Sequence, residues 1–266
     1  MRHATIALLV LFARPPLSAS AGQAQDAAPL RPAFEVAAIK HSANLDAGGT
    51  LGLLPGGRFR SVNFDARTLV AIGYRTRPPR TLLPSQIVGA PDWMSSERYD
   101  INAKISPELA ATMDKNPLLM PALVRSLLED RFRLKVHMEV RELPVYALVV
   151  AKKDGTLGPQ LRQSDVDCQK ERNKCTIRGG TGHFSSGSVT LETLATMLSN
   201  PAGRLVFDRT GLTGKFAADL DWAEEPGSDK SSIFSAVQEQ LGLKLESVRE
   251  PVDVVVIDHV ERPAED

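Results

Sequence analysis

Two side chains that could form a nucleophile and its base stand close together in the segment GHFSSGS, where His183 precedes Ser185 by two residues. Because side chains alternate along an extended strand, both would lie on one face of it. Catalysis by this pair also needs a third group that orients the imidazole, and the sequence contains no G-x-S-x-G motif. The spacing alone therefore does not predict a serine hydrolase.

The histidines that could bind a metal are isolated in the sequence. His41, His137, His183 and His259 have no second ligand at a useful spacing, and the motif H-E-x-x-H is absent. We interpret them as residues of the surface or of strand edges. We predict no metal site and no cofactor.

Asp208 follows an apolar run in VFDRTGLTG, where an aspartate could accept a phosphoryl group as in the phosphorylation loop of ion-pumping ATPases. The further motif G-D-G-x-N-D of those pumps is absent. Gly211 and Gly214 instead favour tight turns, because glycine adopts positive φ without strain. We predict a turn between strands and no phosphorylation of Asp208.

A glycine-rich segment and a set of acidic residues are also candidates for catalytic or ligand-binding motifs, and neither predicts a site. The glycine-rich segment 46–59 lacks the G-K-[ST] ending of a phosphate-binding loop and is expected to be a mobile loop. Paired carboxylates for glycoside hydrolysis would come from Glu97, Asp100, Asp219 and Asp221, which all fit strand edges. No catalytic residue is predicted.

Residue types that are common at interface hot spots gather in PDWMSSERYD, which contains Trp93, Arg98 and Tyr99. These three residues are candidates for a partner surface. The interpretation that we favour is that Trp93 covers the hydrophobic core.

The elements that would carry these residues occur twice. Residues 57–74 align with 182–199, and 127–150 align with 236–257 once two residues are gapped. Each half reads as strand-helix-strand-helix-strand-strand, so the sequence predicts an α+β fold of two pseudo-repeated halves with mixed sheets.

Local signals mark the ends of these elements. Asp65 and Thr190 stand before apolar-periodic runs and are predicted helix N-caps. Each half closes with an apolar, β-branched run, which is typical of a buried central strand. Pro144 and Pro251 are expected just ahead of these last strands.

The N-terminal residues predict export. Residues 1–21 combine a basic start, a short apolar run and an A-x-A exit, which is typical of a signal peptide. Residues 22–31 are expected to be disordered, and the halves at 32–152 and 182–263 to be joined by a linker at 153–181. No segment of the mature chain is long and apolar enough to predict a transmembrane helix.

The two cysteines, Cys168 and Cys175, lie in the predicted linker. An exported chain carries them into an oxidising compartment, so we predict a disulfide between them. So short a loop would contribute about 2–3 kcal/mol.

The charges balance, with 32 basic and 32 acidic residues. Such a chain lacks the excess of lysine and arginine that nucleic acids and anionic membranes attract. We therefore predict neither as a partner, and expect an unknown partner in the cell envelope or outside the cell.

Five blocks carry a resemblance to a known family: FEVAAIK, QIVGAPDWMSSERYDINAKI, LLEDRFRLKVHMEVRELPVYALVVAK, VFDRTGLTGKF and QEQLGLKLESVREPVDVVVIDHVERP. They resemble the soil-associated protein family of acidobacteria over about residues 32–263. The resemblance implies an exported protein of unknown function, whose relatives are sometimes fused to antirepressor-type membrane metallopeptidases. It implies no activity, ligand or catalytic residue.

These observations favour a non-catalytic binding or interaction protein of the cell envelope or the extracellular space. An envelope hydrolase with a site between the two halves is the alternative. The fusions of relatives suggest a periplasmic sensory module as a third hypothesis.

Overall fold

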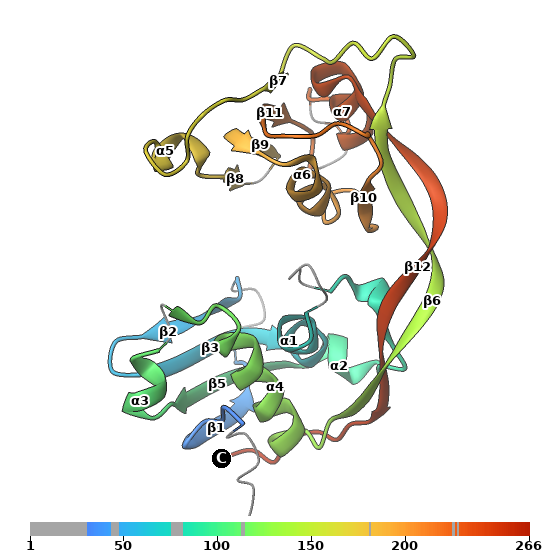
Figure 1. Ribbon diagram of the computed structural model, residues 1–266. Coiled ribbons are helices and arrows are strands. Elements are labelled where there is room, and N and C mark those ends of the chain that lie inside the picture. The colour runs from blue at the N-terminus through green and yellow to red at the C-terminus, as the bar shows by residue number, and fades with distance from the viewer. Residues whose placement is uncertain are drawn as a thin grey trace, which may run out of the picture. The chain divides into compact units, whose positions relative to one another are not determined.

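The computed structural model of the chain describes residues 31–43, 48–75, 82–112, 115–180, 182–224, 227 and 229–266. Figure 1 shows helices beside several β-sheets, so the predicted α+β class is confirmed. The predicted signal peptide and residues 22–30 lie outside the described residues. Among the residues described, no helix has the length and apolar character needed to cross a membrane.

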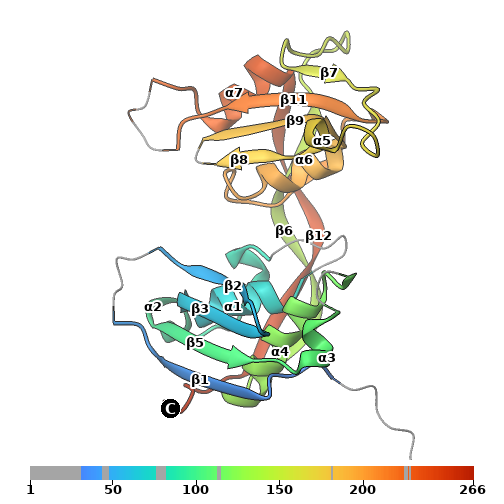
Figure 2. The same ribbon diagram turned by 90° about the vertical axis from the view of Figure 1, so that its left-hand side faces the viewer.

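The first sheet is antiparallel throughout and has the strand order β1-β5-β3-β2, which can be followed in Figure 2. Its strands are β1 (Val36–His41), β2 (Thr50–Leu54), β3 (Arg58–Asp65) and β5 (Arg98–Lys104). The helices of this part of the chain are α1 (Ala66–Gly73), η1 (a 3-10 helix, Pro84–Gln86), α2 (Trp93–Ser96), α3 (Pro107–Ala110) and α4 (Leu119–Arg131).

Alternation along the strands decides which face of this sheet is buried. On β5, Tyr99, Ile101 and Ala103 are buried, and the residues between them are more exposed. Asp65 ends β3 and caps α1, because its carboxylate accepts a hydrogen bond of 2.8 Å from the Thr68 amide. The predicted N-cap is confirmed.

The expectation of a loop across the glycine-rich segment 46–59 is wrong for residues 50–54. They form β2 and pair with β3, with Leu53 opposite Phe59. The turn between the strands uses Gly56 and Gly57, whose φ angles of 80° and 72° are left-handed. The glycines therefore build a hairpin that extends the sheet.

The second sheet is also antiparallel and has the order β7-β11-β9-β8. Its strands are β7 (Leu161–Gln163), β8 (Arg178–Gly180), β9 (His183–Val189) and β11 (Phe216–Asp221). The helices are α5 (Arg172–Cys175), α6 (Leu191–Leu198) and α7 (Ile233–Leu241). Thr190 caps α6 by accepting from the Thr193 amide at 3.2 Å, as predicted.

The segment predicted as a linker, 153–181, contributes to this sheet. Its residues form the edge strands β7 and β8, and Leu161 is buried in the same core as the helices α6 and α7. Gly158 also binds the end of α7, since its amide donates to the Leu241 carbonyl at 2.9 Å. The polar composition of the segment reflects the exposure of these edges.

A third, mixed sheet is built around a long antiparallel ribbon of two strands, β6 (Lys135–Val150) and β12 (Leu243–His259). Two short strands add to it in parallel: β4 (Ile87–Val88) on β12 and β10 (Val206–Asp208) on β6. Each half was expected to end in two strands separated at a proline. That expectation is wrong, because Pro144 and Pro251 lie inside single continuous strands.

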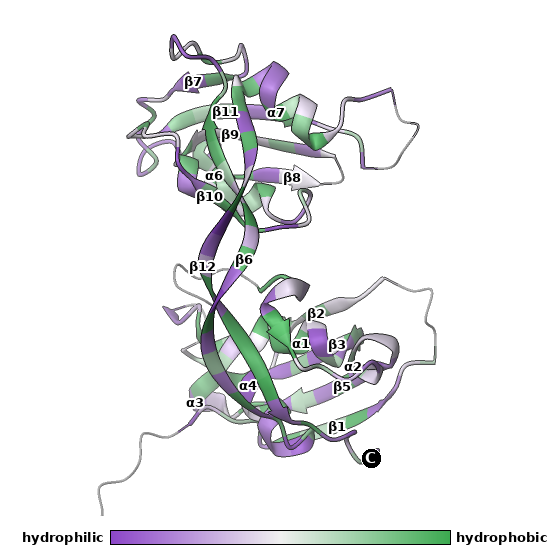
Figure 3. Ribbon diagram, turned by 90° about the vertical axis from the view of Figure 1, so that its right-hand side faces the viewer, coloured by the Kyte–Doolittle hydropathy of each residue, from purple (hydrophilic) through white to green (hydrophobic). Residues whose placement is uncertain are grey.

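The ribbon carries side chains from each half of the sequence into the core of the other. Val255 and Ile257 of β12 are buried with the helices α1 and α4, and Figure 3 shows hydrophobic residues along this part of the ribbon. Leu148 of β6 is buried with α6 and α7. Neither core is therefore made from one contiguous half of the chain.

The order strand-helix-strand-helix-strand recurs in the two halves, from β3 to β6 and from β9 to β12, with the short β4 and β10 at corresponding places. The pairings correspond as well, because each short strand adds in parallel to the long strand of the other half. The duplication of the sequence itself stays a prediction.

Candidate functional site

The outer face of the second sheet brings together polar residues that are distant in the sequence. On β9, His183 and Ser185 are half-buried and point away from the core, whereas Phe184 between them is buried in it. On β11, Asp221 lies directly opposite His183, and Asp219 lies opposite Ser185. Cross-strand partners share a face, so these four polar side chains form one group.

This group supplies the third partner that the sequence did not reveal. The His183 imidazole contacts the Asp221 carboxylate through Nδ1 at 3.3 Å and the Ser185 hydroxyl through Nε2 at 3.3 Å. Lys230 donates to the same Asp221 oxygen at 3.0 Å, and this bond lowers the pKa of Asp221, with a smaller contribution from His183. The arrangement resembles a Ser-His-Asp relay, but Asp221 is shared with a lysine.

His183 is isolated in the sequence but not in the folded protein, so the interpretation of it as a residue without nearby metal ligands is wrong. His183, Asp219 and Asp221 place three potential metal-ligating atoms within 4.8 Å of one another. All three side chains are more than 40% exposed. The signal that could have revealed the group is the D-x-D spacing of β11 opposite the H-x-S spacing of β9, which becomes visible only once the strand register is known.

Beside this group lies an open polar cavity of about 360 Å³ over the same sheet face. It is lined by residues of β7, β8, β9 and β11 and of the disulfide loop: Gln160, Arg162, Asn173, Lys174, Thr176, Arg178, Ser185, Ser186, Gly187, Ala217, Ala218 and Asp219. Three of these side chains are basic and one is acidic. We refer to this site as the basic cavity.

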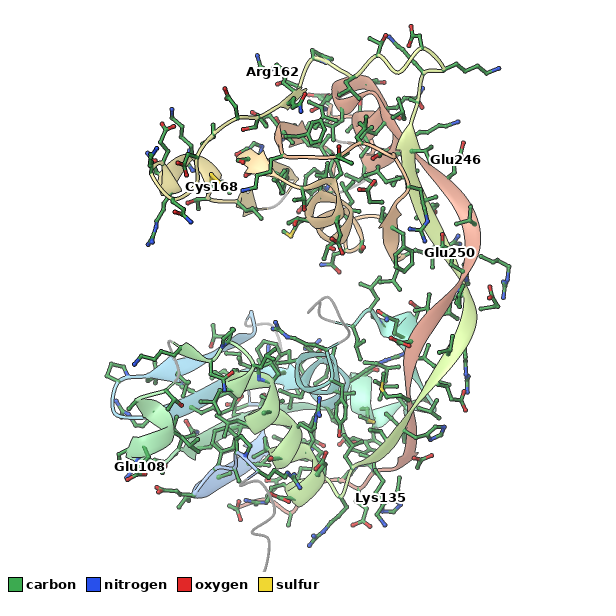
Figure 4. All side chains as sticks on the ribbon, viewed as in Figure 1. Glu108, Lys135, Arg162, Cys168, Glu246 and Glu250 are labelled. Carbon is green, nitrogen blue, oxygen red and sulfur yellow. A yellow bond between two sulfur atoms is a disulfide. The ribbon has the colours of Figure 1, made fainter. Side chains whose placement is uncertain are left out.

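The cations of the basic cavity differ in their partners. Lys174 forms an ion pair with Glu171 within the disulfide loop. Arg162 and Arg178 form no ion pair or side-chain hydrogen bond with any described residue. Arg178 lies opposite Ser185 in the register of β8 and β9. Arg162, labelled in Figure 4, lies on β7 opposite Ala217 of β11. Two guanidinium groups are therefore available for an anionic ligand.

The predicted disulfide between Cys168 and Cys175 is present and closes the loop that walls this cavity. The loop rests on the sheet at Gly187, where an added Cβ would lie 2.6 Å from the Lys174 carbonyl oxygen. Only glycine permits this approach. The Ser164 hydroxyl also donates to the Gly187 carbonyl at 2.6 Å, which fixes the base of the loop.

An apolar groove of about 540 Å³ lies on the opposite side of β8. It is lined by Ile177, Gly179, Gly180, His183, Phe184, Leu194, Met197, Leu198, Asn200, Pro201, Trp222 and Glu224. Ile177 and Met197 are 39% and 44% exposed, which is high for large hydrophobic residues. We call this site the apolar groove.

The three candidates for a partner surface do not share one exposed patch, because Tyr99 is not on the surface. Tyr99 is fully buried in the core of the first sheet and packs edge-on against Phe132. Arg98 donates to the Asn63 carbonyl at 3.3 Å and pairs with Asp65. Trp93 is half-buried and packs against the first core, in agreement with the interpretation favoured from the sequence.

Below Trp93 the C-terminal segment is anchored to Glu97. Arg262 binds the Glu97 carboxylate through bonds of 2.7 and 2.9 Å, and stacks over the Trp93 ring at 5.1 Å. The Tyr99 hydroxyl donates to Glu97 at 2.8 Å. The Arg262 bonds hold the pKa of Glu97 at about 2, whereas burial, followed by the Glu97 bond, raises the pKa of Tyr99.

This pair predicts a specific acid sensitivity. The low pKa of Glu97 stabilises the fold fully above its ordinary value of 4.5, and the stabilisation is lost as the pH falls from there to about 2. In Arg262→Met, the pKa of Glu97 should return toward its ordinary value, so the melting temperature should depend less on pH between 4.5 and 2. The control is Arg172→Met at an exposed arginine. Parallel pH profiles of the wild type and Arg262→Met would contradict the assignment.

The remaining candidate residues have structural roles. Asp208 accepts bonds from the Thr210 amide at 2.9 Å and the Thr210 hydroxyl at 2.8 Å, which is the geometry of a turn, as predicted. Asp100 accepts from Ser42 and from the Asn63 amide. His137 contacts Asp258 at 2.8 Å on an exposed part of the ribbon.

Comparison with known proteins places the chain in a family. The family model described as "Protein of unknown function (DUF3738)" matches residues 67–260. The searches of curated proteins and of solved structures gave no match. The match covers the whole second sheet, the ribbon of β6 and β12 and, of the first sheet, the strand β5. The chain therefore belongs to the DUF3738 family of proteins of unknown function.

Proposed function

We propose that this chain is an exported, non-catalytic binding protein that takes an anionic ligand in the basic cavity. The observation that carries the proposal is the pair Arg162 and Arg178, which line the cavity without an ionic partner among the described residues. A guanidinium group binds a carboxylate or a phosphate through two parallel hydrogen bonds. Two arginines without acidic partners therefore attract a ligand that carries one of these anions. Export is supported by the sequence of residues 1–21 and by the disulfide.

Binding is tested with small anions of defined chemistry. Phosphate, citrate and N-acetylglutamate are titrated into the purified chain and followed by calorimetry. Arg178→Ala should weaken the binding of the best anion about 10- to 100-fold, because a hydrogen bond to a charged group contributes roughly 1.5–3 kcal/mol. Arg172→Ala removes the same charge from the disulfide loop outside the cavity and should leave the affinity unchanged. Equal losses in both variants would refute a specific site.

A hydrolase is the second candidate, and one observation favours it: the contacts that link Ser185, His183 and Asp221. In such a relay, His183 would take the proton of the serine hydroxyl during attack on an ester. The test is turnover of p-nitrophenyl esters, compared between the wild type and Ser185→Ala. Turnover that is lost in Ser185→Ala would replace the binding proposal with a catalytic one.

A further inference from the structure

One strand edge of the second sheet is open. β8 ends the order β7-β11-β9-β8, and no described residue pairs with its outer edge. All three residues of β8 are exposed, and two of them are Gly179 and Gly180. A Cβ added at Gly180 would meet no atom within 4 Å, so the face of the sheet at this residue is uncovered by the described residues. An open edge is a template for one more strand.

The edge of the first sheet at β1 differs from that of β8. There Arg131 donates to the Ala37 carbonyl, and the Asp266 amide donates to the Ile39 carbonyl at 3.2 Å. These contacts occupy acceptors that an added strand would need. Natural sheets commonly protect their edge strands by occupying backbone groups in this way. No described residue occupies the backbone groups on the outer edge of β8.

The basic cavity and the apolar groove lie on opposite sides of this open strand. Arg178 faces the cavity, whereas Ile177 and Gly179 line the groove. Neighbouring residues of a strand point to opposite faces, and a strand added to β8 would follow the same alternation. Its side chains would therefore be directed in turn toward the groove and toward the cavity.

We propose that the partner of this protein is an extended peptide that adds to β8 as a fifth strand of the sheet, with apolar side chains in the groove and acidic side chains toward Arg178. This inference rests on the anion-binding function proposed above and names its ligand class. Backbone hydrogen bonds to β8 would supply affinity, and the two sites would supply specificity.

The lining of each site defines the residues that it accepts. The groove presents Phe184, Leu194 and Trp222 from the side and the exposed Ile177 and Met197 at its rim, so it suits a branched aliphatic or aromatic side chain. The cavity has an excess of positive charge and selects a carboxylate over an ammonium group. Apolar and acidic side chains must therefore alternate along the peptide. We expect no binding of a peptide whose apolar and acidic side chains lie on the same face of the added strand.

The probe is a blocked seven-residue peptide in which leucine and glutamate alternate, titrated by calorimetry into the full chain. Three changes should each weaken its binding at least about tenfold. They are lysine in place of glutamate, N-methylation of alternate peptide amides, and the substitution Met197→Glu in the groove. Leu54→Glu, at a site of 42% exposure on β2, should leave the affinity unchanged. The amide signals of Gly179 and Gly180 should shift on binding.

The outcomes separate this inference from the function on which it rests. If N-methylated and unmodified peptides bind equally, no strand is added and the inference is overturned. The same holds if N-acetylglutamate binds in an Arg178-dependent manner while the peptide binds no more tightly than it. If neither anion nor peptide depends on Arg178, both proposals fail.

Discussion

Residues 32–152, expressed alone, are expected to remain unfolded. This segment corresponds to the first half of the sequence, but its core also contains Val255 and Ile257. Losing these two buried side chains costs about 3–6 kcal/mol, and β6 loses β12, its antiparallel partner from Lys135 to Val150. Together these losses approach the total stability of an ordinary domain, about 5–15 kcal/mol.

Urea unfolding followed by near-ultraviolet circular dichroism measures this effect. The half-chain should show no cooperative transition, and residues 32–266 serve as the control with a sigmoidal one. A half-chain that unfolds cooperatively would show that the first core is complete without β12.

The second large effect is expected for Gly158→Ala. A Cβ at this position would lie 2.3 Å from the Gln240 carbonyl oxygen and 2.6 Å from the Gly242 amide nitrogen. Both atoms belong to the backbone at the end of α7, so neither can rotate away. The substitution should lower the free energy of unfolding by about 3 kcal/mol, at the upper end of the cost of overpacking.

The matched control is Gly52→Ala on β2, where an added Cβ meets no atom within 4 Å. Its free energy of unfolding should stay within about 0.5 kcal/mol of the wild type. Both variants are compared by urea unfolding. Equal stability of the two would mean that the segment before β7 does not pack on α7.

The sequence predicted what depends on neighbouring residues. The caps at Asp65 and Thr190 were predictable because the side chain and the amide that it accepts from are three residues apart. The disulfide was predictable because only two cysteines exist. The turn at Asp208 followed from the glycines around it.

The sequence did not predict what depends on strand register and on contacts between distant segments. Asp221 lies opposite His183 only because β11 pairs with β9 in one particular register, and a shift of one residue would turn it to the other face. Tyr99 was a candidate for a partner surface because its residue type is common at interfaces. It is buried because alternation on β5 directs it to the core.

Strand β12 completes the core of the first half, and β6 contributes to the core of the second half. This arrangement determines when the protein can fold during synthesis. During synthesis, Leu134 leaves the ribosome about 120 residues ahead of Val255, a delay of roughly 6–25 s at ordinary elongation rates. Through that interval the first core lacks its last strand. The first core can therefore close only after β12 has been synthesised, so it remains incomplete for most of the time that the chain is being made.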